Sequence, residues 1–325
     1  MAMNIKYAQI KAFRDQEMSH VWSSSSQLNL LHDEIIKQTV NLAVESFQSE
    51  FGPPPSPFCF FVMGSAGRSE QGIWSDQDHG IIFNETRDVK AQEYFLTLGK
   101  EISEGLVETG YQKCDGNVMA SNRLWCKSFE DWDKQLKSWV LEASWEYIRH
   151  LLTFIDGRCL YGEDLIGHLK QSIYPFIHQK QLLSRILENT MHVKKGVNVL
   201  GQFLVDTHGH MTGSFNLKET AIFPYVNAAR VMAIRESSLI TSTYERLHLL
   251  PDSVLKEKYA KQFLTLQSYR LQYGIHTGYD SGHYVAIGRL SKQQRKELKE
   301  ILKDGISLFD YVKKLVEKDD QHGHE

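Results

Sequence analysis

Residues 58–83 read FCFFVMGSAGRSEQGIWSDQDHGIIF, a polar segment between two short apolar runs. The first run, residues 58–63, is too short for an ordinary helix, and its length favours a buried strand. Residues 80–83 predict a second strand of the same kind. The polar segment therefore begins where one strand ends and finishes where the next begins.

Asp76 and Asp78 stand directly before the second strand, separated by one residue. In an extended segment alternate side chains share a face, so the two carboxylates lie together while Gln77 and His79 point away. Two neighbouring carboxylates repel unless a cation lies between them, and hard oxygen ligands suit Mg²⁺ or Mn²⁺. Such ions bind nucleotide phosphates and stabilise charge in phosphoryl transfer. We expect Asp76 and Asp78 to be metal ligands and catalytic residues.

A pair of metal ions normally requires a third carboxylate. Asp115 is the candidate, because it lies just before a plausible third strand. It could equally be a turn residue, since aspartate is common in turns. The third metal ligand is therefore Asp115 on one interpretation and absent on the other.

The turn at residues 64–68 has the composition of a phosphate-binding turn. Gly64 and Gly67 let the backbone approach a ligand and expose N–H groups, and Ser65 adds a hydroxyl donor. Arg68 either binds a phosphate or holds Glu70 or another acid in place. A glycine-rich polar segment is most often a solvated hairpin loop. The order of its features, with the turn first and the paired acids second, favours a nucleotide site instead. A Walker loop is not indicated, because no Gly-Lys-Ser/Thr sequence follows the glycines.

Around this segment the sequence predicts a mixed unit. Apolar residues at helical spacing over 28–47 and 89–107 predict helices that flank the strands. Strands and helices mixed in this way indicate an α/β or α+β arrangement. We predict an α+β fold, in which residues 1–150 form a small mixed-sheet catalytic domain with an N-terminal helix.

Helical spacing dominates from about residue 139 onward. Apolar faces recur over 183–204, 226–233 and 298–316. We therefore predict an all-α helical bundle over residues 151–325. Within it, Lys218 could hold a triphosphate or an acidic acceptor, or could be a surface side chain lying along a helix. Asp156 and Arg158, at the start of this half, could reach the active site, but a structural ion pair at a helix end is the favoured interpretation.

The composition of the 325 residues narrows the classes of partner. Lys and Arg number 37 and Asp and Glu 40, so no overall positive field indicates binding to nucleic acid or to an anionic membrane. No run of about 18 apolar residues predicts a membrane span, and the N-terminus lacks a signal-peptide pattern. The four cysteines have no paired spacing and read as thiols of a reducing compartment. We expect a cytoplasmic protein.

Together these residues resemble the nucleotidyltransferases similar to protein-PII uridylyltransferase, which are built on a DNA polymerase beta type of catalytic fold. The catalytic signature of that family is matched by Gly64-Ser65, Gly67-Arg68, Glu70-Gln71 and Ser75-Asp76-Gln77-Asp78. Further similarity lies in Cys114 to Trp125, in Asp156 with Arg158, and in Leu217-Lys218, Ile222-Phe223-Pro224 and Ala229-Arg230. The resemblance covers the chain from about residue 25.

The resemblance implies a metal-dependent enzyme that moves UMP or AMP from UTP or ATP to a hydroxyl group and releases pyrophosphate. It also implies that Asp76 and Asp78 bind the metals and that the helical half is a substrate-binding domain. The acceptor it suggests is a PII-like regulatory protein, although a small molecule is equally compatible with the residues. The alternative is a catalytically inactive module that senses nucleotide and binds a protein partner.

Overall fold

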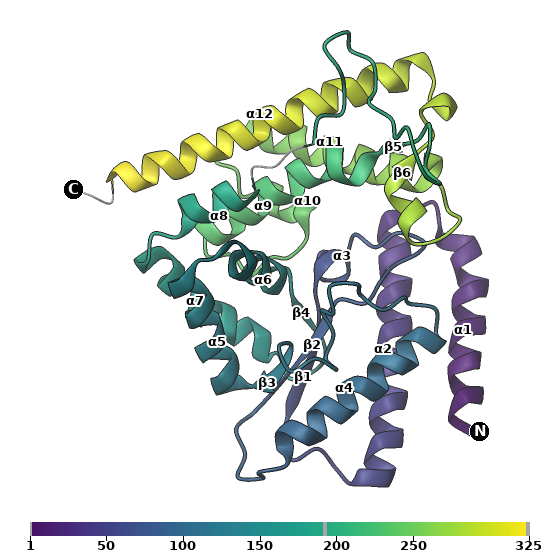
Figure 1. The fold of residues 1–325 in the computed structure, drawn as a ribbon, viewed down its shortest axis with the longest axis vertical. Helices are drawn as coiled ribbons and strands as arrows, with labels where there is room; N and C mark the ends of the chain where they lie inside the picture. Colours follow the sequence, from purple (N-terminus) through teal and green to yellow (C-terminus); the bar gives the residue numbers. More distant parts are fainter. Residues whose placement is uncertain (1, 191–193, 323–325) are drawn as a thin grey trace. The chain divides into compact units, whose positions relative to one another are not determined.

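The computed structural model describes residues 2–190 and 194–322 and divides the chain into two compact units (Figure 1). Unit 1 comprises Met1–Leu141 and Thr153–Ile173, and unit 2 comprises Glu142–Leu152 and Tyr174–Glu325. The α+β prediction is confirmed, because a small mixed sheet occurs in unit 1 and helices dominate unit 2. None of the helices in the described ranges is long and apolar enough to cross a lipid bilayer.

The sheet of unit 1 has four strands in the order β3-β2-β1-β4. They are β1 (Phe58–Val62), β2 (His79–Phe83), β3 (Cys126–Ser128) and β4 (Arg158–Gly162). The central strand β1 pairs antiparallel with β2 and β4, and β2 pairs parallel with β3. Every residue of β1 and β2 is buried, as the apolar runs predict. The turn and the two aspartates therefore lie in the connection between the two central strands.

Helices cover both faces of this sheet. On one face α2 (Ser25–Phe51) and α4 (Ala91–Glu108) contribute to a common core with alternate residues of β1 and β2, and Phe83 stacks on Phe95 at 4.4 Å between ring centroids. On the other face Phe61 contacts Trp132 of α5 (Phe129–Glu142). Each buried aromatic side chain stabilises the fold by about 1.5–3 kcal/mol. An additional helix, α1 (Ala2–Val21), precedes α2.

The third strand is not where the sequence suggests it. A strand was expected just after Asp115, but residues 114–122 form turns, in which the Asn117 N–H donates to the Cys114 carbonyl at 2.9 Å. Asn117 has a positive φ of 54°, which extended strands do not adopt. The third strand is β3, which begins at Cys126.

The fourth strand comes from beyond residue 150. β4 joins the sheet because its residues pair with β1, Phe61 with Cys159 and Phe60 with Tyr161. Each compact unit is therefore made of two separate segments of the chain. The helix α6 (Trp145–Ile155) begins in unit 2 and ends in unit 1. The assignment of catalysis to residues 1–150 and substrate binding to residues 151–325 stays a prediction.

Unit 2 is built mainly from helices. These are α7 (Leu165–Gln179, from Tyr174 onward), α8 (Leu183–Thr190), α9 (Phe223–Arg235), α10 (Thr243–Leu247), α11 (Ser253–Tyr273) and α12 (Lys292–His322). The unit is not all-α, because β5 (Phe215–Asn216) and β6 (Tyr284–Val285) form a two-stranded sheet.

The helix expected over residues 183–204 is shorter than its apolar spacing suggests. It ends at Thr190, and residues 194–204 contain no helix; Val193, part of the expected face, lies outside the described residues. The Asn198 side chain accepts hydrogen bonds from the N–H groups of Leu200 and Gln202, both at 2.9 Å. This local turn competes with helix formation.

Candidate functional site

Asp76, Asp78 and Cys114 form a group that could hold a metal ion. Each offers one ligand atom, and these atoms all lie within 4.8 Å of one another. Within residues 2–190 and 194–322 this is the one group of at least three such side chains. All three residues are partly buried.

The backbone around the two aspartates is extended and tied on both sides. The Met63 N–H, at the end of β1, donates to the Asp78 carbonyl at 2.7 Å. On the other side the Gln77 N–H donates to the Gln112 carbonyl at 2.9 Å. The extended path explains why the carboxylates share one face.

Gln77 and His79 point to the opposite side, as the alternation predicts, and both are buried. The Ala120 N–H donates to Nδ1 of His79 at 3.1 Å, so Nε2 carries the proton and donates to Oε1 of Gln77 at 3.0 Å. Burial lowers the pKa of His79 to about 3. The hydrogen bond from Ala120 likewise requires a neutral imidazole, so His79 ties the second strand to residue 120.

The turn predicted to hold phosphate is the short helix α3 (Gly64–Gly67). Gly64 has a φ of +54°, and a Cβ added there would overlap Oδ2 of Asp78. A Cβ on Gly67 would overlap the backbone carbonyl of Asp156. The start of the turn thus lies directly against the Asp78 carboxylate, and its positive φ favours glycine. Helix geometry leaves the N–H groups of Gly64, Ser65 and Ala66 without an acceptor inside α3.

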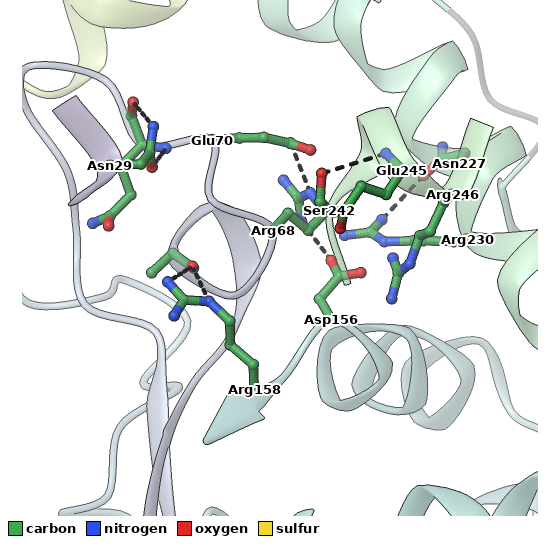
Figure 2. A network of polar contacts seen from close by, with 12 residues as sticks. Asn29, Arg68, Glu70, Asp156, Arg158, Asn227, Arg230, Ser242, Glu245 and Arg246 are labelled. Carbon is green, nitrogen blue, oxygen red and sulfur yellow. Dashed lines mark hydrogen bonds and ion pairs between the residues drawn. The ribbon is translucent and has the colours of Figure 1, made fainter. Parts of the chain in front are cut away.

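Arg68 follows this turn and is held by two acids rather than pointing to solvent (Figure 2). Its Nε donates to Glu70 at 2.8 Å, and its Nη1 pairs with Asp156. Burial disfavours the charge of Arg68, but the two carboxylates outweigh it and raise its pKa. Of the two roles predicted for Arg68, the structure therefore supports holding Glu70 and a second acid in place.

Arg158 supports the same turn from β4, as the close-up shows (Figure 2). Its Nη2 donates to the Ala66 carbonyl at 2.9 Å and pairs with Asp33 of α2 at 2.5 Å. The sequence suggested that Asp156 and Arg158 pair with each other. They do not. Asp156 pairs with Arg68, and Arg158 pairs with Asp33 and donates to the Ala66 carbonyl, because β4 lies beside β1.

A second set of contacts, which sequence analysis missed, ties α2 to the loop between the turn and the aspartates. Oδ1 of Asn29 accepts the Gln71 N–H at 2.8 Å. His32 donates through Nε2 to the Gly72 carbonyl at 2.9 Å and accepts from the Tyr111 hydroxyl through Nδ1. The signal was present in the sequence, because polar residues three apart on a buried apolar helix face require partners.

The structure separates the remaining predicted residues. Asp115 is exposed in the turn after Cys114, and its carboxylate is not part of the Asp76–Asp78 group, so its role as metal ligand remains a prediction. Cys114 stands in that place instead. Burial, followed by the Asp78 carboxylate, raises the pKa of the Cys114 thiol to about 12. A protonated thiol is a weak ligand for Mg²⁺, which prefers oxygen.

Lys218 lies in unit 2, in the π-helical turn Lys218–Ile222. Its Nζ donates to Nε2 of His283 at 3.0 Å and lies 5.8 Å from the ring centroid of Tyr279. Its role in nucleotide binding stays a prediction, because Lys218 belongs to unit 2 whereas the two aspartates belong to unit 1.

Comparison with known families identifies the chain. A family model described as "Putative nucleotidyltransferase DUF294" matches residues 11–146, which include α3, Asp76 and Asp78. The chain belongs to this nucleotidyltransferase family. A second model, described as "Putative nucleotidyltransferase substrate binding domain", matches residues 180–315. No curated protein matches the chain. The family resemblance in the sequence is confirmed, while similarity to protein-PII uridylyltransferase stays a prediction.

Proposed function

We propose that the protein transfers a nucleoside monophosphate from a nucleoside triphosphate to a hydroxyl group and releases pyrophosphate. The observation that carries the proposal is the contact between Gly64 and Asp78, where a side chain on the glycine would overlap the carboxylate. It brings the start of a phosphate-binding turn directly against a pair of acids. A polyphosphate on the turn would have its reacting phosphate beside the groups that hold a divalent metal.

Asp76 and Asp78 would hold Mg²⁺ or Mn²⁺. Their oxygen atoms fit hard cations, and phosphate oxygens of a nucleotide would complete the coordination. When bound, the metal supplies charge stabilisation for in-line displacement at the phosphate. Cys114 is the third group within reach, and as a neutral thiol it would border the site more than it would bind the metal.

The other residues of the site bind and position. The N–H groups at the start of α3, with the Ser65 hydroxyl, would bind oxygens of the β- and γ-phosphates. Arg68 is a positioning residue, since its guanidinium is engaged by Glu70 and Asp156. Lys218, in unit 2, stays a predicted nucleotide-binding residue.

The donor and the acceptor are proposed from family resemblance. UTP or ATP would supply the transferred group, and a PII-like regulatory protein or a small molecule would supply the hydroxyl. The substrate-binding family match of residues 180–315 supports an acceptor site in the helical half.

The proposal is tested with α-labelled ATP and UTP, Mg²⁺ or Mn²⁺, and cell extract as the source of acceptor. We expect label transfer by the wild type and none by the Asp76→Asn/Asp78→Asn variant. Equal labelling by both proteins would refute the assignment. Metal-dependent nucleotide binding without any transfer would instead support the nucleotide-sensing alternative.

Two single variants decide the third ligand. If Cys114 only borders the site, Cys114→Ser retains metal binding, read from the Mn²⁺ electron paramagnetic resonance signal. If Asp115 is a ligand, Asp115→Asn weakens Mn²⁺ binding. Its exposed position predicts that it does not, and weakened binding would restore the carboxylate expected from the sequence.

A further inference from the structure

Cys59 of β1 and Cys159 of β4 lie on the same face of neighbouring strands. Both are free thiols. In the register, Cys59 is opposite Gly162 and Phe61 is opposite Cys159, with a bulge after Phe60. Residues two apart on a strand share a face, so Cys59 and Cys159 are diagonal neighbours.

The side chain of Cys159 leans along its strand toward Cys59. Its Sγ lies 3.6 Å from the Tyr161 carbonyl oxygen, 3.9 Å from that of Gly162 and 3.6 Å from that of Glu163. Gly162, opposite Cys59 in the register, carries no side chain. Neither thiol belongs to the Asp76–Asp78–Cys114 group.

The two thiols differ in exposure and in chemistry. Cys59 is fully buried, whereas Cys159 is partly exposed. A hydrogen bond between the thiols raises the pKa of Cys59 and lowers that of Cys159. An accessible thiol with a lowered pKa next to a second thiol has the arrangement of an oxidisable pair.

We propose that Cys59 and Cys159 are a reversible oxidation site, at which a hydroperoxide converts the two thiols into a disulfide between β1 and β4. The Cys159 thiolate attacks the peroxide oxygen, the O–O bond breaks, and a sulfenic acid forms on Cys159 as an alcohol, or water from hydrogen peroxide, leaves. The Cys59 sulfur then attacks the sulfenic sulfur, the S–S bond forms, and water leaves. Two thiols lose two electrons and two protons, and the peroxide is reduced. A dithiol reductant reverses the change.

The bond would act on elements that position the nucleotidyl site. β1 leads through Met63 into Gly64, and Arg158, the neighbour of Cys159, donates to the Ala66 carbonyl. Closing an S–S bond of about 2.05 Å would draw these two positions together, and we expect the strands to shift. The bulge between Phe60 and Phe61 is the place where the ladder is already irregular, and β4 is an edge strand, which pairs in the sheet with β1 alone. We expect this shift to move α3, the turn proposed to bind phosphate.

The test uses the full-length protein, reduced, desalted and treated with hydrogen peroxide. Remaining thiols are blocked with N-ethylmaleimide after denaturation, and the disulfide-linked peptides are mapped by mass spectrometry. We expect a peptide pair joining Cys59 to Cys159, a fall from four to two free thiols per chain, and recovery of four after dithiothreitol. Cys114 and Cys126 should remain reduced and react with N-ethylmaleimide. Oxidation of Cys159 to sulfinic acid without a cross-link, or a cross-link that involves Cys114, would overturn the proposal.

Matched serine variants sharpen the result. Cys159→Ser should abolish the cross-link, whereas Cys126→Ser, a buried cysteine of β3, should leave it unchanged. The peptide map of the wild-type protein tests the proposal by itself. The test therefore still decides the question if the Cys159→Ser variant fails to fold. The readout uses no nucleotide, and the outcome is therefore independent of whether the protein catalyses nucleotidyl transfer.

Discussion

Gly64 is the residue at which the backbone geometry and the chemistry of the site meet. Its φ of +54° lies in the left-handed region, which costs a non-glycine residue about 1–2 kcal/mol. In Gly64→Ala the new Cβ would also displace the Asp78 carboxylate. We expect a small loss of unfolding free energy and a loss of about 100-fold in transfer rate, because misplacing a reacting group by about 1 Å has that effect. Urea unfolding and labelled-nucleotide transfer measure the two quantities.

Gly201→Ala is the matched control. Gly201 also has a positive φ, +72°, but an added Cβ there would meet no atom within 4 Å. It should lose stability through strain and keep its transfer rate. If both variants lose activity equally, the contact with Asp78 is not what makes Gly64 necessary.

The lowered pKa of His283 predicts how the stability of unit 2 depends on pH. Burial, followed by the charges of Lys218 and Arg270, lowers its pKa to about 3, against about 6.5 in an unfolded chain. Between these values the unfolded state binds a proton that the folded state does not, so stability rises with pH from 3 to 6.5 and is lost on acidification. The destabilisation caused by His283→Gln should therefore be about 2 kcal/mol smaller at pH 5 than at pH 7. Urea unfolding at both pH values measures it, and an unchanged difference would contradict the buried neutral imidazole.

At the scale of elements, α2 acts as a support for the loop that carries the aspartates. In Asn29→Ala the Gln71 N–H loses its buried acceptor, which costs about 1–3 kcal/mol. We expect that loss in urea unfolding, together with weaker Mn²⁺ binding, because the loop before Asp76 is less restrained. Asn41→Ala makes the same change on the exposed side of the same helix and should alter neither quantity. Equal effects of the two variants would mean that α2 matters only as a helix.

The elements also show why sequence predicted some features and missed others. The strands at residues 58 and 80 and the helix over residues 28–47 were predictable, since apolar runs and apolar spacing are local signals. The shared face of Asp76 and Asp78 follows from alternation alone. β4 was missed, because its place beside β1 depends on pairing between residues about 100 apart. For the same reason the approach of Cys114 to the aspartates, and the partners of Arg68 and Arg158, required the tertiary fold.

At the scale of the whole molecule, the near-neutral charge suits the proposed chemistry. The formal net charge is −3, and the proposed site would rely on backbone N–H groups and acidic residues rather than on a basic surface. Arg68, which follows the turn, and Arg158, which donates to it, are both engaged by carboxylates. A triphosphate would therefore be bound chiefly through the metal ions that accompany it.

The exchange of segments between the two units predicts which pieces of the chain can fold. A fragment of residues 1–150 lacks β4, and with it Asp156, so it leaves the buried Arg68 without one of its two acids. Breaking such a buried pair costs about 3–5 kcal/mol. A fragment of residues 1–173 keeps the four-stranded sheet and all contacts of α3 described above. We expect cooperative thermal unfolding and Mn²⁺ binding for 1–173 and neither for 1–150, as measured by circular dichroism and electron paramagnetic resonance. Equal folding of both fragments would show that β4 is dispensable, and would place the end of the catalytic unit at residue 150 after all.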